Sequence, residues 1–181
     1  MRITKVQIPR NFEMHRLEGT EHIKEFDCGD EDLNDFILNE SQNYSKAMIS
    51  VTYIIVDKSR VIAYFSLAND KLSVSDFNSN SEFNRFRKHR FPYEKMLRSY
   101  PAVKLCRLAI DISAKGLGIG TILVSFIKVL YKQNNRAGCR FVTVDAYNTA
   151  APFYEKNGFQ LLTKKENKGN TVPLYYDLTA I

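Results

Sequence analysis

The stretch Lys115-Gly116-Leu117-Gly118-Ile119-Gly120 places three glycines at alternate positions between two apolar runs, at 105–112 and 121–131. These runs are typical of a strand and a helix. Glycine adopts backbone dihedrals that other residues avoid, and without a Cβ it lets a ligand approach the backbone closely. The unpaired N–H groups at a helix start, with the positive end of its dipole, attract anions. The stretch therefore predicts a phosphate-binding turn.

Two common phosphate-binding loops fit this spacing poorly. A P-loop has a lysine and then Ser or Thr directly after its last glycine, whereas Gly120 is followed by Thr121 and Ile122. A dinucleotide-binding loop has G-x-G-x-x-G and an acidic residue about 20 positions later, whereas Asp145 comes too late here. The remaining alternative is a glycine-rich turn that only permits tight packing of a strand against a helix.

The residues around these glycines resemble the acyl-CoA-binding core of the GNAT family of N-acetyltransferases. That family's pyrophosphate loop reads Gln/Arg-x-x-Gly-x-Gly/Ala, and Lys115, Gly118 and Gly120 match it. Lysine keeps the positive charge of arginine but loses its planar fork. Downstream, residues 141–148 are similar to the family's next strand, and residues 150–159 to its helix ending in Phe-Tyr-x-x-x-Gly-Phe.

The resemblance extends upstream and covers about residues 15–178 of the chain. Residues 26–36 and the apolar stretches at 52–57 and 61–67 are similar to a GNAT subgroup that contains toxins which acetylate aminoacyl-tRNA. The implied fold is mixed α/β (α+β), with a central, mostly antiparallel, twisted sheet of about six to seven strands, flanked by helices. The sheet is expected to have a V-shaped split at the acyl-CoA site.

The resemblance also implies roles for individual residues. Tyr154 matches the tyrosine that protonates the departing CoA thiolate, and the alternative is that it only packs beneath the cofactor. The backbone of residues 108–110 is expected to hold the pantetheine arm, with the N–H near Leu108 polarising the carbonyl. The implied acetyl-CoA-binding residues are Leu108, Ala109, Ile110, Lys115, Gly116, Leu117, Gly118, Ile119, Gly120, Thr121 and Asn148.

A general base for the acceptor amine is not evident in the sequence. The central strand carries Arg107 and Asp111 where many family members have a glutamate, and Asp111 is interpreted as a cap of the loop. Asp145 is a weak candidate for contacting the amine, and we expect a surface or ion-pair role instead. An aminoacyl ester has a less basic α-amine than lysine and needs less help, which favours the toxin-like acceptor, charged tRNA.

A basic and aromatic insert at residues 76–100 is the second prominent feature. Its members include Phe83, Arg85, Phe86, Arg87, Lys88, His89, Arg90, Phe91, Tyr93, Lys95 and Arg98. Such residues can hold a nucleic-acid backbone and stack on bases. The alternative is an amphipathic helix whose phenylalanines lie in the core. Arg85, Arg87 and Arg90 are candidate acceptor-binding residues, and Arg107 either meets an acceptor phosphate or pairs with a carboxylate.

Composition limits the class of protein. The 181 residues suit a single domain over 1–181, and 44% hydrophobic residues suffice for a core. Three scattered cysteines and three scattered histidines predict a reducing, cytoplasmic location with no disulfide framework and no metal site. No apolar run reaches the about 18 residues that a membrane span needs. The net charge of +6 permits an anionic ligand such as CoA or RNA.

Periodicity and turn residues predict the order of elements. Strands are expected over residues 13–17, 50–56, 61–69, 104–112, 141–147, 159–165 and 173–178, the last two joined across 167–170. Helices are expected over 31–45, capped by Asp27 or Asp30, and over 121–134. Asn148 is expected to cap a short helix that has Pro152 in its first turn and ends at Gly158.

The function expected from the sequence is transfer of an acetyl group from acetyl-CoA to a primary amine. Protein and small-molecule amines compete with charged tRNA as acceptor, and the resemblance implies a homodimer and, for a toxin, an antitoxin partner. The alternative is a non-catalytic module that senses acyl-CoA or binds RNA on the same fold, because fold alone does not determine function.

Overall fold

The computed structural model of the chain describes residues 12–88, 90–91, 97–133, 137–163 and 169–180. The chain divides into two compact units. The first unit comprises residues 1–68 and 105–127, and the second comprises residues 69–104 and 128–181. Two long strands and one helix continue from one unit into the other, so neither unit is a continuous segment of sequence.

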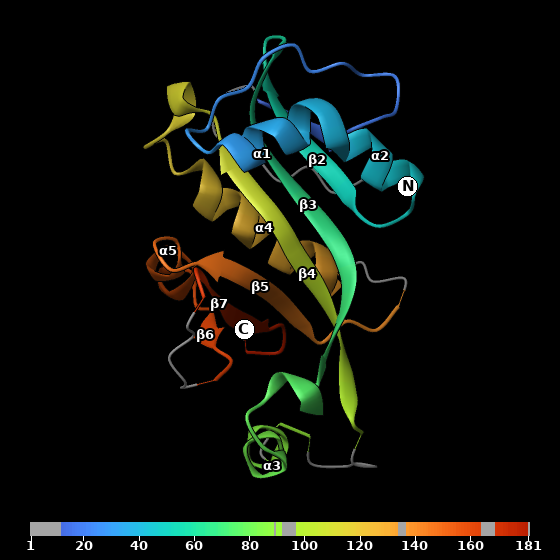
Figure 1. The fold of residues 1–181 in the computed structure, drawn as a ribbon, viewed down its shortest axis with the longest axis vertical. Helices are drawn as coiled ribbons and strands as arrows, with labels where there is room; N and C mark the ends of the chain where they lie inside the picture. The colour runs from blue at the N-terminus through green and yellow to red at the C-terminus, as the bar shows by residue number, and fades with distance from the viewer. Residues whose placement is uncertain (1–11, 89, 92–96, 134–136, 164–168, 181) are drawn as a thin grey trace. The chain divides into compact units, whose positions relative to one another are not determined.

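Seven strands form one sheet in the order β1-β2-β3-β4-β5-β7-β6 (Figure 1). They are β1 (Glu13–Arg16), β2 (Val51–Asp57), β3 (Arg60–Ser73), β4 (Ser99–Ile110), β5 (Phe141–Tyr147), β6 (Gln160–Leu161) and β7 (Thr171–Asp177). β1–β2, β2–β3, β5–β7 and β6–β7 pair antiparallel. β4 pairs parallel with β5 over residues 102–104 and 141–143. The expected mostly antiparallel sheet is confirmed.

Helices connect these strands. They are α1 (Glu31–Asp35), the π-helical turn η1 (Phe36–Glu40), α2 (Ser41–Lys46), the 3₁₀ turn η2 (Val74–Asp76), α3 (Asn80–Lys88), the 3₁₀ turn η3 (Ile112–Ala114), α4 (Ile119–Gln133) and α5 (Ala151–Lys156). In the part of the chain that the structure describes, no helix is both long and apolar enough to cross a membrane.

The helix expected over residues 31–45 is present but is not uniform. The side chain of Asp30 accepts a hydrogen bond from the Leu33 N–H at 3.1 Å and caps α1. Of the two caps that the sequence predicts, Asp27 and Asp30, the structure has Asp30. The middle turn, η1, is π-helical and buries the consecutive residues Phe36 and Ile37. A π turn contains an extra residue, which sequence periodicity does not reveal. We call the continuous segment of residues 31–46 the N-terminal helical segment.

Other expected boundaries differ from the structure. β4 begins at Ser99 and not at Lys104, and the carbonyl of Pro101 within it accepts a hydrogen bond from the Arg140 N–H at 2.9 Å. β4 ends at Ile110, where Asp111 begins η3. The expected cap of α5 is wrong: Ala150 is the N-cap residue and Asn148 lies two residues earlier. Parts of the expected elements at 134 and 164–168, including the turn at Asn167–Lys168, lie outside the described residues.

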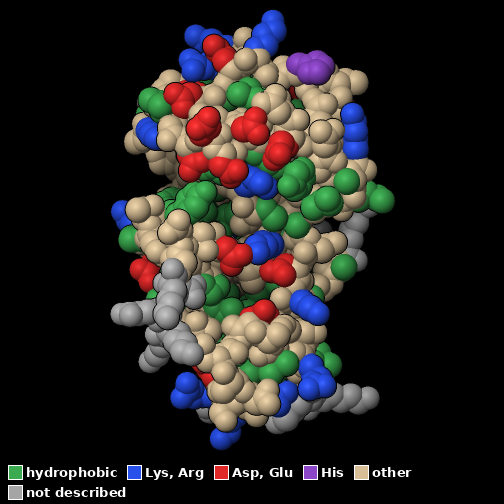
Figure 2. Space-filling model, in the orientation of Figure 1, with side chains coloured by type: hydrophobic (Ala, Val, Ile, Leu, Met, Phe, Trp, Pro, Cys, Tyr) green, Lys and Arg blue, Asp and Glu red, His purple; other side chains and the backbone are tan. Residues whose placement is uncertain are grey.

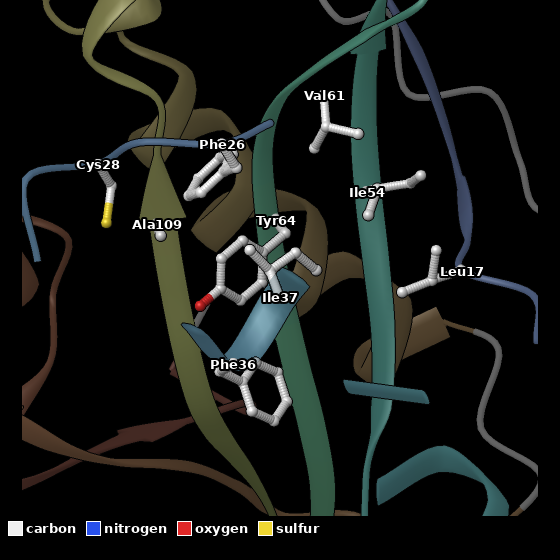
Figure 3. Packing of buried hydrophobic residues seen from close by; sticks show 9 residues of the cluster. All are labelled: Leu17, Phe26, Cys28, Phe36, Ile37, Ile54, Val61, Tyr64 and Ala109. Carbon is white, nitrogen blue, oxygen red and sulfur yellow. The ribbon is translucent and has the colours of Figure 1, made fainter. Parts of the chain in front are cut away.

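The core of the first unit lies between the N-terminal helical segment and β2, β3 and β4 (Figure 3). Its buried members are Leu17, Phe26, Cys28, Phe36, Ile37, Ile54, Val61, Tyr64 and Ala109. Tyr64 is fully buried, and its hydroxyl donates to the Leu33 carbonyl at 2.7 Å. Burying one large apolar side chain contributes about 1.5–3 kcal/mol, so this cluster fixes the helical segment on the sheet.

The core of the second unit contains the aromatic residues of the insert. Phe83 is buried, and Phe86 and Phe91 pack against a cluster that includes Tyr100 and Phe141. The rings of Phe91 and Tyr100 are stacked with centroids 3.9 Å apart. These phenylalanines therefore pack as the amphipathic-helix alternative predicts, and their rings are not free to stack on bases. His89, Tyr93 and Lys95 of the insert lie outside the described residues.

Candidate active site

The glycine stretch forms a turn between η3 and α4, as the sequence predicts. Gly116 and Gly118 have φ values of 78° and 74°, in the left-handed region that favours glycine. α4 begins at Ile119, so Gly120 lies in its first turn and has no special dihedral role. A Cβ at Gly116 or Gly118 would meet no atom within 4 Å, so the space above the loop is open. Glycine is favoured at these two positions by the backbone dihedrals and not by crowding.

The turn exposes hydrogen-bond donors. Gly116, Leu117 and Gly118 are exposed, and their N–H groups donate to no other described residue. The first N–H groups of an α-helix also lack intrahelical partners, and the helix dipole adds partial positive charge there. Because α4 begins directly after Gly118, the loop and the helix start together can bind an anion through their backbone.

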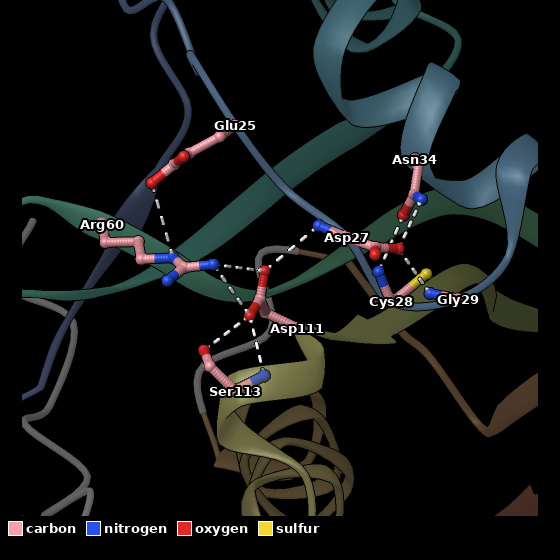
Figure 4. Close-up of polar contacts among 8 residues, drawn as sticks. All are labelled: Glu25, Asp27, Cys28, Gly29, Asn34, Arg60, Asp111 and Ser113. Carbon is pink, nitrogen blue, oxygen red and sulfur yellow. Dashed lines mark hydrogen bonds and ion pairs between the residues drawn. The ribbon is translucent and has the colours of Figure 1, made fainter.

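Asp111 fixes the start of this loop (Figure 4). Its carboxylate is only 1% exposed and accepts hydrogen bonds from the Ser113 N–H at 2.9 Å and the Ser113 hydroxyl at 2.6 Å. It also accepts from the Asp27 N–H at 3.1 Å and from the Arg60 guanidinium at 3.3 Å. The expected capping role is confirmed, and Asp111 in addition joins the loop before α1 to the end of β4.

The electrostatics of Asp111 follow from these contacts. Burial by itself would raise the pKa of its carboxyl, but the bonds from Ser113 and Asp27 and the attraction of Arg60 outweigh burial and hold the pKa below its usual value. The Arg60 side chain is 47% exposed, so water screens its charge and the backbone and hydroxyl donors matter most. Asp111 is therefore a charged structural group and is not suited to accept a proton from a substrate.

Lys115, which matches the basic position of the family's loop, has a defined contact in the structure. Its ammonium donates to the carbonyl of Cys28 at 2.8 Å. The neighbouring Gly29 has a φ of 82°, and a Cβ added there would lie 3.6 Å from the same ammonium nitrogen. No sequence pattern predicts this contact, because the two residues are 87 positions apart and the acceptor is a backbone carbonyl.

The strand expected to hold the pantetheine arm is the end of β4. Leu108 and Ile110 are half-buried there, and Ala109 is buried in the core of the first unit. Among the described residues, no carboxylate forms an ion pair with Arg107, and its alternative partner, an acceptor phosphate, stays a prediction. Its guanidinium carbon lies 3.7 Å from the centroid of the Phe36 ring, a cation–π contact that holds the side chain against the N-terminal helical segment.

Tyr154 lies on α5 in the second unit and is 7% exposed. Its ring packs edge-on against Phe153 and Phe159, with centroids 5.1 and 5.5 Å away. Burial raises its pKa to about 12, so the phenol is protonated at neutral pH. Its hydroxyl forms no hydrogen bond with any described residue, and the phenol proton is available to a ligand.

Asn148, also in the second unit, is exposed at the end of β5. Its side-chain amide donates to the Gly169 carbonyl at 3.1 Å, and its backbone N–H donates to the Asn170 carbonyl at 2.9 Å. These bonds connect the β5 end to the segment before β7. The amide carbonyl oxygen is the part of the side chain left for a ligand.

The arginines proposed for acceptor binding differ in accessibility. Arg90 is half-buried: it donates to Phe86 and to the Tyr175 hydroxyl at 2.8 Å each, and lies 3.6 Å from Asp177. Arg87 donates to the Leu97 carbonyl at 3.2 Å. Arg85 is exposed and has no contact of this kind within the described residues.

Asp145 has the ion-pair role that the sequence predicts. Its carboxylate lies 2.5 Å from the ammonium of Lys104 on the neighbouring strand. Both side chains are partly exposed, so the pair contributes little to stability. Among the described residues, no cluster of three His, Cys, Asp or Glu side chains could hold a metal ion.

Residues 82–161 match the family model of the acetyltransferase (GNAT) domain. This part of the chain is a GNAT acetyltransferase domain. The match includes all of β4, the glycine loop, α4, β5 and the Tyr154 helix. No curated protein sequence matches the chain significantly.

Solved structures of toxins are similar to this chain over almost its full length. AtaT complexed with acetyl-methionyl-tRNAfMet is 26% identical, with a TM-score of 0.73 over 94% of this chain and 96% of that one. A tyrosine-to-phenylalanine variant of KacT is 25% identical, with a TM-score of 0.73 over 94% and 97% of the two chains. AtaTR bound with acetyl-CoA is 25% identical, with a TM-score of 0.71 over 93% and 95%.

Proposed function

We propose that the protein transfers the acetyl group of acetyl-CoA to the α-amine of an aminoacyl-tRNA and acts as a toxin that an antitoxin neutralises. The observation that supports this most is its similarity, over 94% of the chain, to AtaT in complex with acetyl-methionyl-tRNAfMet. AtaT also binds the C-terminus of the antitoxin AtaR, which is the basis for the proposed partner. The acceptor is thus chosen from several amine classes by this similarity.

The glycine loop is proposed to bind the donor. The exposed N–H groups of residues 116–118 and those of the first turn of α4 would hold the CoA pyrophosphate. The backbone of residues 108–110 would pair with the pantetheine arm, with a β4 N–H polarising the thioester carbonyl. Asn148 would bind the same arm through its amide oxygen, since its amide nitrogen already donates to Gly169.

Tyr154 is proposed as the general acid for the departing thiolate. With a phenol pKa of about 12 and a thiol pKa of about 8.5, complete proton transfer is uphill by about 5 kcal/mol. A hydrogen bond that shares the phenol proton with the developing thiolate still stabilises the transition state, and water then supplies the final proton. The unpaired hydroxyl of Tyr154 supports this role.

No carboxylate of the described site is suited to be a strong base. Asp111 is buried and fully bonded, and Asp145 pairs with Lys104. The amine must therefore be partly neutral when it arrives. An aminoacyl ester provides such an amine, whereas a lysine side chain with a pKa of about 10.4 does not. Arg85, exposed on α3, is the insert arginine best suited to meet an RNA phosphate.

Gly118→Ala is expected to weaken CoA binding by about tenfold in Kd. The φ of 74° disfavours any side chain by about 1 kcal/mol, and the new Cβ enters the space above the loop that a pyrophosphate would fill. Calorimetric titration with CoA measures the effect. Gly138→Ala is the matched control, because its Cβ meets nothing and its φ is not left-handed. Equal Kd values for both variants would argue against the loop as the CoA site.

The function is tested by release of free CoA from acetyl-CoA across a panel of amines. The panel contains charged tRNA, deacylated tRNA, a lysine peptide and small polyamines. We expect release with charged tRNA only, and growth arrest on induction of the wild-type gene. Release with the peptide alone would refute the tRNA acceptor. Tight CoA binding with no release for any amine would favour the alternative of a non-catalytic acyl-CoA sensor.

A further inference from the structure

The loop of residues 26–30, which leads into α1, is attached to the start of the glycine loop by three hydrogen bonds. The Asp27 N–H donates to Asp111 at 3.1 Å, and the Ile112 N–H donates to the Asp27 carbonyl at 2.7 Å. The ammonium of Lys115 donates to the Cys28 carbonyl at 2.8 Å. Two of these bonds precede the glycines, and only the third starts from a residue of the glycine loop itself. We call residues 26–30 the entry loop.

The entry loop also holds the start of the N-terminal helical segment. The side chain of Asp27 accepts from the Gly29 N–H at 2.8 Å and from the Asn34 amide at 3.0 Å. The Asn34 side chain accepts from the Cys28 N–H at 2.9 Å. Because these bonds close a ring between the loop and the first turn of α1, a shift of the loop moves the helix start with it.

The N-terminal helical segment in turn contacts the strand before the glycine loop. Phe36 packs with Ala109 in the same core cluster and carries the guanidinium of Arg107 on its ring. Tyr44 of α2 packs edge-on against Phe36, and its ring centroid lies 5.4 Å from the Arg107 guanidinium carbon. The entry loop and the segment therefore reach the proposed CoA site at two places: the entry loop contacts Lys115 through Cys28, and the segment contacts Arg107 of β4.

We propose that Lys115 is a positioning residue that couples CoA binding at the glycine loop to the order of the entry loop and the N-terminal helical segment. This rests on the proposed function, in which the backbone of the glycine loop binds the pyrophosphate. Lys115 acts through the Cys28 carbonyl and is not itself a ligand of the phosphates. Its ammonium is the only side-chain donor among these three hydrogen bonds, because backbone N–H groups donate the Asp27–Asp111 and Ile112–Asp27 bonds.

The physical basis of the coupling is the orientation of the loop. When an anion binds the N–H groups of residues 116–118, the turn loses conformational freedom, and Lys115 at its base is held in one direction. An ordered Lys115 keeps its bond to Cys28 for a larger fraction of the time, so the entry loop opens less often. Coupling of this kind between two sites is reciprocal and typically changes affinity or protection by about fivefold or more.

The test is amide hydrogen exchange with and without saturating CoA, read in peptides that cover residues 26–33 and 116–122. In the wild-type protein, CoA is expected to slow exchange in both peptides by about fivefold or more. In Lys115→Met the glycine-loop peptide should still be slowed, whereas the entry-loop peptide should no longer respond. Lys115→Arg, which retains a cation of similar reach, should restore the response. Lys46→Met, which removes an exposed lysine at the end of α2, is the control and should behave as wild type.

Each other outcome overturns the proposal in a recognisable way. A Lys115→Met protein whose entry loop still responds to CoA shows that Lys115 does not carry the coupling. A variant that loses CoA binding at the glycine loop, with Kd raised more than about 50-fold, shows that Lys115 is a phosphate ligand. A wild-type protein in which CoA slows neither peptide refutes CoA binding at the loop, and with it both the proposed function and the coupling.

Discussion

Replacing Tyr154 with phenylalanine is expected to lower kcat by about 10- to 10⁴-fold, with little change in the affinity for acetyl-CoA. The ring of Tyr154 packs between Phe153 and Phe159, and phenylalanine retains this packing. The hydroxyl has no partner among the described residues, so its removal leaves no buried group unpaired. The loss is therefore confined to the proton that the phenol offers to the thiolate. Steady-state release of CoA with charged tRNA, and calorimetric titration with CoA, measure the two quantities.

The matched control is Tyr53→Phe. The Tyr53 ring stacks on Phe65 with centroids 5.0 Å apart, a contact that phenylalanine also retains. This variant should keep the wild-type kcat. If Tyr154→Phe also keeps it, the tyrosine only packs beneath the cofactor and another group or water protonates the thiolate. A large loss of CoA affinity in Tyr154→Phe would likewise speak against an acid role.

Asp111→Ala is expected to reduce the free energy of unfolding by about 3 kcal/mol. The substitution removes a buried carboxylate and leaves the N–H groups of Asp27 and Ser113 without their acceptor. Chemical denaturation with urea at neutral pH measures the change. Asp145→Ala is the control, because its carboxylate is exposed and its ion pair with Lys104 should contribute at most about 1 kcal/mol. Equal losses for the two variants would contradict the central structural role of Asp111.

The contribution of Asp111 should also depend on pH. Its pKa is lower in the folded protein than in the unfolded chain, so the folded state binds the proton less readily. The stabilisation is fully present above the pKa of Asp111 in the unfolded chain, which is about 4. It is lost as the pH falls through the lower pKa of Asp111 in the folded protein. The difference in unfolding free energy between wild type and Asp111→Ala should therefore be constant from neutral pH to about pH 5 and shrink in stronger acid. A difference that grows on acidification would refute this assignment.

The sequence predicted those parts of the fold that local chemistry determines. β5 has the expected bounds, because Val142, Val144 and Ala146 alternate with less buried residues. The glycine turn follows from the left-handed dihedrals that Gly116 and Gly118 supply. The early start of β4 could not be predicted, because proline lacks a backbone donor and is uncommon inside strands, yet Pro101 lies within β4.

The candidate site was less predictable, because its contacts link distant parts of the chain. Asp111 was interpreted as a cap, and its bond to the Asp27 N–H joins residues 84 positions apart. Lys115 was matched to a pyrophosphate loop, yet its ammonium binds a backbone carbonyl, which no side-chain pattern encodes. Arg107 was expected to meet a phosphate or a carboxylate; its guanidinium packs on the Phe36 ring, a contact that the sequence does not predict, and the phosphate partner stays a prediction. The single domain over residues 1–181 and the individual acetyl-CoA contacts stay predictions.

The cysteines make the protein convenient for the assay on which most of these experiments depend. Burial raises the pKa of Cys139 to about 11 and raises that of Cys28 as well. Thiol-specific dyes react with the thiolate, so both side chains should remain silent at the mildly alkaline pH at which such dyes are used. Cys106, which is half-buried, is the thiol to replace by serine if a background signal appears. Colour that develops during turnover can then be assigned to newly liberated CoA.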